Sequence, residues 1–269
     1  MKVIKTYKYQ LRLSKEKEAK CYQTLGVCRL IYNECLNYKI MLHREHQQSI
    51  GKTQLQKEVK ELAKEYHWIK SVHSQVRQNA LHRLLQTYDN FFKRGAGFPK
   101  FAKRHKYKSF TYPQGAKING NYIYLPKIGW IKFYPNQNIP KESVIKTTTI
   151  TKEADAWQVS ITVETDHNIK YLYDENQAIG IDLGVKYYYV SSDGDFIRNP
   201  SFLKQFANKI RKLNRKLARQ VKGSNRRNKT KKILQKVYLK LRRKRQDFIH
   251  KLTYNLVKSN SIIIVENLK

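Results

Sequence analysis

The N-terminal part of the chain passes from an alternating apolar–polar pattern to a helical one. Residues 3–13 read VIKTYKYQLRL, and this period of two predicts a β-strand. Ser14 is a suitable N-cap and acids follow in the next turn, so a long helix is predicted from Lys15 to about His46. Helical spacing returns over 53–66 and 74–92 and stops at Gly95 and Gly97, just before Pro99. Residues 14–95 are therefore expected to form a small helical bundle that follows a strand.

From residue 107 onward the pattern changes to short aromatic and β-branched runs. Five such runs, separated by turn residues, are SFTYP, YIYLP, WIKFYP, VIKTTTI and WQVSITVE. Several short strands at close spacing predict a small barrel or sandwich. The strand at 3–13 must pair somewhere, because an isolated strand leaves its backbone groups without partners, so we expect it to join this sheet. The helical bundle is then an insertion into the β-domain.

A third region begins near residue 177. The run AIGIDLGV reads as an apolar strand with one acid, and YYYVSSDGDFI continues as a hairpin with Asp193 and Gly194 at its turn. Two basic helices are predicted over 201–220 and 229–259, joined by the loop VKGSNRRN, and the apolar strand SIIIVENLK follows them. This succession of strand, hairpin, helices and strand is an α/β order.

Charge decides which kinds of partner to expect. The 269 residues include 55 Lys plus Arg and 20 Asp plus Glu, a formal net charge of +35. Such self-repulsion favours a polyanion as the partner, nucleic acid first and a membrane surface as the weaker alternative. No apolar stretch approaches the roughly twenty residues of a membrane helix, and the N-terminus lacks a signal-peptide core. We therefore expect a cytoplasmic protein.

The three cysteines recur on one helical stripe, at positions 21, 28 and 35, together with Leu42. This spacing predicts small buried hydrophobic residues rather than metal ligands or disulfide partners. No CxxC pair occurs, and His43 and His46 share a helix face without a further ligand nearby. No zinc site is expected.

Two acids stand at the ends of runs that are otherwise apolar. Asp182 interrupts the run IGIDLGV, and Glu266 follows four apolar residues, 262–265. A buried carboxylate is costly unless it is compensated, although an acid that caps the turn into Gly184 explains Asp182 equally well. If the two strands are neighbours in one sheet, both carboxylates lie in one region and can share Mg²⁺. Two-metal phosphodiester cleavage uses such a cluster.

The segment 201–250 carries about half of the net charge. It contains 19 Lys plus Arg and a single acid, Asp247. A solvated helix face normally interleaves acids, so their absence favours an external polyanion over a merely solvated surface. Apolar residues at helical spacing predict one buried side, formed by Leu203, Phe206, Ile210, Leu213 and Leu217. The predicted phosphate-binding residues are Arg211, Lys212, Arg215, Lys216, Arg219, Lys222, Arg226 and Arg227.

Aromatic and basic residues are interleaved between residues 98 and 133. The aromatic ones are Phe98, Phe101, Tyr107, Phe110, Tyr112, Tyr122, Tyr124, Trp130 and Phe133. We assign most of them to the core, and a minority is available to stack on unpaired bases. Lys100 and Arg104, which lie among them, are further predicted nucleic-acid contacts.

Several segments of the sequence, taken together, resemble a known protein family. The segments GIDLGVKYYYVSSDG, NPSFLKQFANKIRKLNRKLARQVKGSNRRNKTKKILQKVYLKLRRKRQDFIHKLTYNLV and IIIVENLK resemble the TnpB (OrfB) family of transposon-encoded proteins. Earlier segments agree, namely LGVCRLIYNECL, YDNFFKRGAGFPKFAKR and LPKIGWIKF. The resemblance covers essentially the whole chain in the family's order.

The resemblance implies an RNA-guided DNA endonuclease related to type V CRISPR effectors. Its implied fold is α+β and multidomain: a β-barrel wedge domain (1–13 and 96–175), an inserted helical recognition domain (14–95) and a ribonuclease H-like (RuvC) α/β domain (176–269). Asp182 and Glu266 match the first two RuvC acids, which use Mg²⁺. Guide RNA and both double-stranded and single-stranded DNA are the implied partners. Gln78 is a candidate base-edge reader, since Gln pairs bidentately with adenine, while an exposed helix Gln explains it equally well.

The chain also departs from the family. Members continue past the second acid with more helices, two CxxC pairs that bind zinc and a third catalytic Asp, so the RuvC domain is expected to be incomplete here. We expect RNA binding with weak or absent cleavage, because a metal cluster that loses a carboxylate loses most of its activity. The alternatives are a cleavage-dead protein that occupies DNA through its guide RNA, and a structural RNA-binding protein in which only charge matters.

Overall fold

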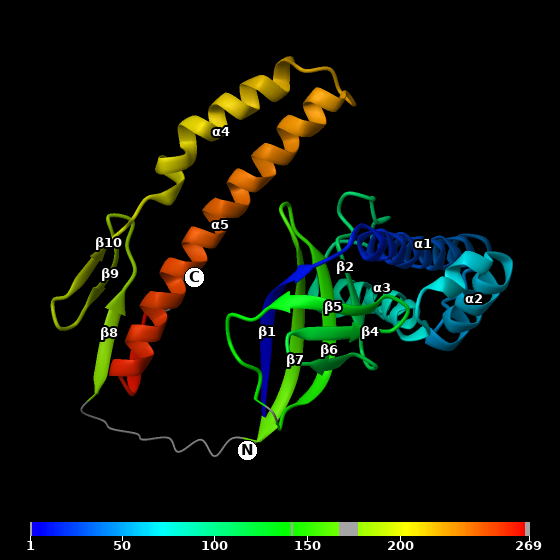
Figure 1. The fold of residues 1–269 in the computed structure, drawn as a ribbon, viewed down its shortest axis with the longest axis horizontal. Coiled ribbons are helices and arrows are strands. Elements are labelled where there is room, and N and C mark those ends of the chain that lie inside the picture. Colours follow the sequence, from blue (N-terminus) through cyan, green and yellow to red (C-terminus); the bar gives the residue numbers. More distant parts are fainter. Residues whose placement is uncertain (1, 141, 167–176, 267–269) are drawn as a thin grey trace. The chain divides into compact units, whose positions relative to one another are not determined.

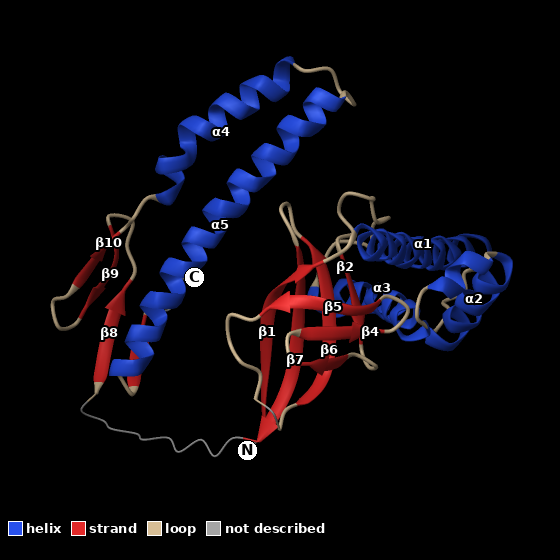
Figure 2. Cartoon of the chain, in the orientation of Figure 1, coloured by secondary structure: helices blue, strands red, loops and turns tan. Residues whose placement is uncertain are grey.

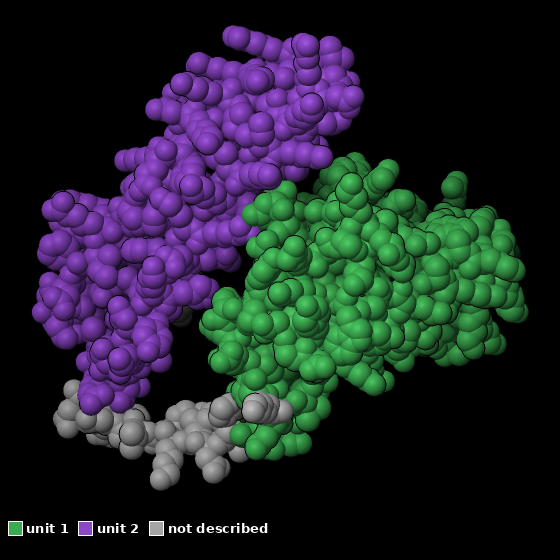
Figure 3. Space-filling model, viewed as in Figure 1, with its two compact units in different colours: residues 1–168 green, residues 169–269 purple. Residues whose placement is uncertain are grey.

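The chain forms two compact units. The computed structural model describes residues 2–140, 142–166 and 177–266, and the units comprise residues 1–168 and 169–269 (Figure 3). Helices and strands occur in both, so the fold is mixed α+β (Figure 2). Each unit is described by itself.

The first unit combines seven strands with three α-helices (Figure 1). Its strands are β1 (Lys2–Arg12), β2 (Ser109–Tyr112), β3 (Lys117–Asn119), β4 (Tyr122–Leu125), β5 (Gly129–Tyr134), β6 (Val144–Lys152) and β7 (Trp157–Asp166). Its helices are α1 (Lys15–His46), α2 (Lys52–Glu65), the short 3₁₀ turn η1 (His67–Ser71) and α3 (Ser74–Arg94).

The seven strands form one antiparallel sheet in the order β2-β6-β7-β1-β5-β4-β3. β1 pairs with β7 from Lys2↔Asp166 to Leu11↔Trp157, and with β5 at Gln10↔Tyr134. The prediction that the N-terminal strand joins the later strands is therefore confirmed. The expected barrel is a half-barrel, because within the described residues β2 and β3 remain the two edges of the sheet.

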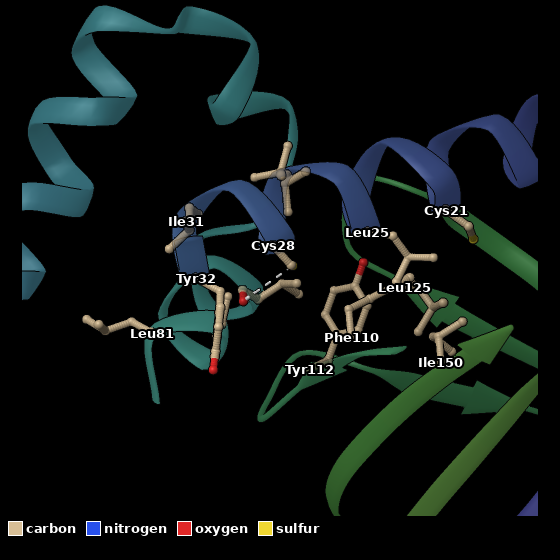
Figure 4. Packing of buried hydrophobic residues seen from close by; sticks show 14 of the residues in the cluster. Cys21, Leu25, Cys28, Ile31, Tyr32, Leu81, Phe110, Tyr112, Leu125 and Ile150 are labelled. Atoms are coloured by element: carbon tan, nitrogen blue, oxygen red, sulfur yellow. Dashed lines mark hydrogen bonds between the residues drawn. The ribbon is translucent and has the colours of Figure 1, made fainter. Parts of the chain in front are cut away.

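The helices and the sheet share one hydrophobic core. Cys21, Cys28 and Cys35 are at most 1% exposed on α1, and Figure 4 shows this face of the helix turned toward Phe110 and Tyr112. The prediction that the cysteine stripe belongs to the core is confirmed. Burial raises the pKa of each thiol to about 12, so the thiols remain protonated and unreactive at neutral pH.

Local signals set the helix ends where the sequence placed them. The Ser14 side chain accepts a hydrogen bond from the backbone N–H of Lys17 at the start of α1. α3 ends at Gly95, whose φ of 64° suits a glycine in the left-handed C-cap position. The strand β3 and the turn η1 were not predicted, since three and five residues are too short to establish a period.

The second unit contains a four-stranded sheet and two long helices. The sheet order is β10-β9-β8-β11, and its strands are β8 (Ala178–Asp182), β9 (Tyr187–Ser191), β10 (Phe196–Arg198) and β11 (Ile262–Val265). The helices are α4 (Phe202–Arg219) and α5 (Asn225–Ser259). The predicted hairpin is confirmed as β9–β10, with Gly194 at a φ of 86° in its turn.

Candidate functional site

The two strand-end acids lie at the ends of neighbouring strands. β8 and β11 pair in parallel, and the last register pair is Ile181↔Val265. Asp182 and Glu266 are the next residues on the two strands, so their backbones lie about 5 Å apart, the ordinary distance between paired strands. Residues 84 positions apart in the sequence are therefore neighbours, as the prediction required.

The burial of these acids differs from the expectation. Both Asp182 and Glu266 are exposed, and β11 is an edge strand whose Ile264 and Val265 are 61% and 59% exposed. The sequence predicted that each acid ends a buried strand, which is wrong for β11. Exposed carboxylates are solvated, so their presence here carries no desolvation cost.

The turn that follows β8 needs a glycine. A Cβ atom on Gly184 would lie 3.1 Å from the backbone oxygen of Tyr187, which is too close without a shift of the chain. The glycine therefore lets the backbone reverse directly after Asp182 and return as β9, with Val190 opposite the acid. This tight return fixes the position of the Asp182 backbone within the sheet.

The two acids fit a partial magnesium site. Carboxylate oxygens are hard ligands, and Mg²⁺ in proteins is commonly held by one or two carboxylates together with water and substrate phosphates. Across 2–140, 142–166 and 177–266, no group of three or more His, Cys, Asp or Glu side chains could hold a metal ion. The strand register therefore brings together two candidate ligands, Asp182 and Glu266.

Two basic helices connect these strands. α4 and α5 pack through Ile210, Val237 and Leu241, with Phe206 and Leu213 against them. The predicted apolar side of α4 is thus confirmed at these positions, whereas Leu203 is 52% exposed and lies outside the core. The sole acid of this segment, Asp247, pairs with Lys251 across one turn of α5 at 2.9 Å.

The cations of α4 form a stripe over a shallow hollow. Lys212, Arg215, Lys216 and Arg219 line it together with Gln220, and the four cations recur at intervals of three and four residues, which keeps them on one helix face. Arg211, Lys222 and Arg226 are exposed as well. We call the four lining cations the α4 stripe. It presents a concentrated positive surface to solvent.

Arg227 is engaged within the protein. Its Nη1 donates hydrogen bonds to the backbone oxygens of Leu217 and Gln220, the latter at 2.9 Å. Ser224 caps α5 by accepting a hydrogen bond from the Arg227 backbone N–H at 3.2 Å. Arg227 therefore joins the end of α4 to the start of α5, which sequence reasoning did not anticipate when it placed the residue with the phosphate contacts.

The remaining predicted contacts belong to the first unit. Gln78 is exposed on α3, and Lys100 and Arg104 are exposed in the segment between α3 and β2. One turn before Gln78, the pKa of His73 is lowered chiefly by burial and further by the cations Lys127 and Arg77. Gln78, Lys100 and Arg104 are thus accessible to solvent.

Several cations of α5 were not among the predicted phosphate-binding residues. Those on its first half are exposed like the α4 stripe: Lys229, Lys231, Lys232, Lys236 and Lys240. Lys244 lies over the rings of Phe202 and Phe206, at 5.9 and 5.7 Å from their centroids. The lack of neighbouring acids, which pointed to α4 as a phosphate-binding helix, holds equally for these α5 cations and could have identified them.

Two family profiles match the chain. One, described as "Probable transposase" (OrfB of IS605), matches residues 158–269, and one described as "Helix-turn-helix domain" matches residues 1–48. The described residues 2–48 form a strand and one uninterrupted helix, so the second description is not reflected in the local fold.

Curated relatives match over the whole chain. The chain is 30% identical over 273 residues to an Escherichia coli (strain K12) protein named "Putative RNA-guided DNA endonuclease InsQ", covering 100% of this chain and 67% of that protein. A Streptomyces pristinaespiralis protein named "Putative RNA-guided DNA endonuclease" is 26% identical over 277 residues, covering 99% and 67%.

A solved structure has a similar fold. The chain titled "Cryo-EM structure of the Cas12f1-sgRNA-target DNA complex" matches with a TM-score of 0.56 at 11% identity, covering 99% of this chain and 81% of that one. At this identity the likeness concerns the fold alone. In the described part of the chain, none of the helices has the length and apolar character that a membrane crossing requires.

Proposed function

Because this chain belongs to the TnpB (OrfB) family of transposon-encoded proteins, we propose that it binds a guide RNA and uses it to engage DNA. The two curated relatives that align with the whole of this chain are named as putative RNA-guided DNA endonucleases. The net charge of +35 suits a partner of this kind, since nucleic-acid phosphates neutralise it.

The observation that carries the proposal is the parallel pairing of β8 with β11. It places Asp182 and Glu266 at adjacent strand ends, and the chain between them forms the β9–β10 hairpin and then the two basic helices. The basic surface and the two strand-end acids therefore belong to the same unit, which supports the proposal. We assign residues 176–269, which lie within this unit, to a ribonuclease H-like (RuvC) domain, 14–95 to a recognition domain, and 1–13 with 96–175 to a wedge domain.

Asp182 and Glu266 are the residues that would hold Mg²⁺. When bound, the ion would activate water and stabilise the leaving oxygen of a phosphodiester. The α4 stripe and Arg211, Lys222 and Arg226 would contact phosphates, which positions a strand without reading its sequence. Lys100 and Arg104 would add such contacts on the first unit, and Gln78 would read a base edge.

We infer that the 269-residue chain cleaves weakly or not at all. Where the resemblance implies three acids, the register of β8 with β11 supports two neighbouring ones, and a metal cluster short of one ligand loses both geometry and charge neutralisation. The second candidate function is therefore target occupancy, in which guide-directed binding itself is the activity. The exposure of Asp182 and Glu266 is compatible with this function, because solvated acids need no catalytic reason to persist.

The proposal is tested with purified chain and the RNA that copurifies with it. Binding to a DNA duplex complementary to the guide segment is compared with binding to a mismatched duplex, and the guide segment is then replaced. We expect the replacement to redirect binding to the new complement. Binding that ignores the guide would contradict the proposed function.

Cleavage is measured in the same samples with Mg²⁺. Asp182→Asn is compared with Asp193→Asn, a matched change of an exposed acid in the hairpin turn of the same sheet. We expect little or no cutting from any of the three proteins. Cutting by the unmodified chain that is lost only in Asp182→Asn would overturn the inference of weak cleavage and would leave guided binding intact.

A further inference from the structure

One face of the sheet in the first unit carries large aromatic side chains toward solvent. Tyr122, Trp130 and Tyr134 are 47%, 43% and 49% exposed, although they lie on regular strands. Their neighbours in the strands, Ile123 and Ile131, are at most 1% exposed and face the core. The alternation of β4 and β5 thus places apolar residues inside and aromatic residues outside, where a polar residue is usual.

Strand register gathers these rings into one patch. Tyr124 is opposite Trp130, with ring centroids 5.4 Å apart, and Tyr122 is opposite Lys132. Since residues paired across adjacent strands project to the same side, the rings and Lys132 share one surface. We call Tyr122, Tyr124, Trp130 and Tyr134 the aromatic face.

Cations and amides border the aromatic face. β3 places Lys117 opposite Tyr124 and Asn119 opposite Tyr122, and β1 places Arg12 opposite Lys132 and Gln10 opposite Tyr134. None of β1, β3, β4 and β5 contains an acid. The four strands therefore offer π-surfaces together with positive charge and carry no acid of their own.

The other half of the same sheet has a different composition. On the corresponding face, β6 and β7 carry Thr149 opposite Ser160 and Thr151 opposite Gln158. These four side chains are polar and are partly or fully buried, and none of them is aromatic. The aromatic residues are confined to the β3–β4–β5 half, so the composition of that half requires its own explanation.

We propose that the aromatic face binds unpaired RNA by stacking its bases on Tyr122, Trp130 and Tyr134. Bases stack on exposed aromatic rings largely independently of sequence, while nearby cations hold the phosphates. Lys117, Lys132 and Arg12 supply those cations. Asn119 and Gln10, at the border, supply amide groups that can bond the 2′-hydroxyl, the group that distinguishes RNA from DNA. The aromatic face is thus a second nucleic-acid surface, in addition to the α4 stripe.

The test measures tryptophan fluorescence of the full chain during titration with unlabelled oligouridine. Trp130 is half-exposed and Trp157 is buried, while Trp68 is 48% exposed on η1 and serves as the matched control. We expect RNA to quench the fluorescence of the unmodified chain and of Trp68→Phe. Trp130→Phe should lose the quench yet keep its affinity within about threefold, because a phenyl ring still stacks.

Affinity is measured in parallel by anisotropy. Trp130→Ala and Tyr122→Ala should each weaken oligouridine binding about tenfold, whereas Ser160→Ala on the other half of the sheet should not. All of these residues but Ser160 are exposed, so circular dichroism should report an unchanged fold. An unchanged affinity in Trp130→Ala, or a quench that survives in Trp130→Phe, would overturn the stacking site.

Two further probes define the ligand. A duplex RNA should not quench Trp130, since its bases are already stacked, and oligodeoxyuridine should bind more weakly than oligouridine because it lacks only the 2′-hydroxyl. Equal quenching by the duplex would contradict stacking, and equal affinity for oligodeoxyuridine would overturn the assignment to RNA. An unguided homopolymer is used throughout, so the outcome is independent of the proposed guide-directed function.

Discussion

The α4 stripe permits a quantitative prediction about salt. Replacing Lys212, Arg215, Lys216 and Arg219 by Gln removes four cations from one helix face. Each phosphate contact on duplex DNA contributes about 0.9 to the slope of log affinity against log salt, so four contacts contribute about 3.6. When the salt is raised fourfold, from about 50 to 200 mM, the affinity of the unmodified chain should then fall by a factor about 150 times larger than the factor for the variant.

The assay is an anisotropy titration of a labelled DNA duplex at several KCl concentrations. A matched control replaces Lys52, Lys57, Lys60 and Lys64 on α2 by Gln. It removes the same number of positive charges, four, from a helix that also carries acids. We expect the control to lower the affinity slightly and to keep the slope. Parallel salt plots for the stripe variant and the unmodified chain would refute the assignment of phosphates to this face.

Three further predictions concern stability and reactivity. Arg227→Ala should speed amide hydrogen exchange at the junction of α4 and α5. It should also lower the unfolding free energy by about 1–3 kcal/mol, because two backbone oxygens lose a charged donor. Unchanged exchange at the junction would refute the role of Arg227 in joining the two helices. Glu18 accepts from Trp157 Nε1 at 2.9 Å and Lys152 Nζ at 3.2 Å, and these partners hold its pKa below the ordinary value. Glu18→Ala should therefore cost about 1 kcal/mol at neutral pH, discounted for partial exposure, and the difference in melting temperature should shrink as the pH falls through that lowered pKa. All three cysteines should resist iodoacetamide at pH 8 until the chain is unfolded, since burial raises their pKa values to about 12; rapid labelling of the folded chain would contradict this.

Local signals were sufficient to predict most elements. The Ser14 cap, the Gly95 stop and the turn at Gly194 act within a few residues, and each appears where the sequence placed it. Pairing between segments that are distant in the sequence could not be predicted in this way. Periodicity assigns faces to a strand without naming its neighbour, so the parallel contact of β8 with β11 remained conditional until the structure was known.

Exposure was harder to predict than secondary structure. In the run YIYL every residue is apolar or aromatic, so hydropathy alone does not reveal that Ile123 faces the core and Tyr122 faces solvent. The run IIIV was read as buried for the same reason, although β11 is an edge strand. The role of Arg227 depends on where the α4 backbone ends, which composition does not encode.

If the chain binds nucleic acid as proposed, the crossover between β8 and β11 links that binding to the folding of the second unit. Pairing these strands closes a loop of about 80 residues, an entropic cost that local contacts within the α4–α5 hairpin reduce. The hairpin itself is self-repelling, because it holds most of the 19 cations of residues 201–250. A polyanion that binds the folded helices more tightly than the unfolded segment therefore stabilises the paired strands by mass action. The nucleic acid would then be a structural component of the second unit, and Asp182 and Glu266 would meet most often when it is bound.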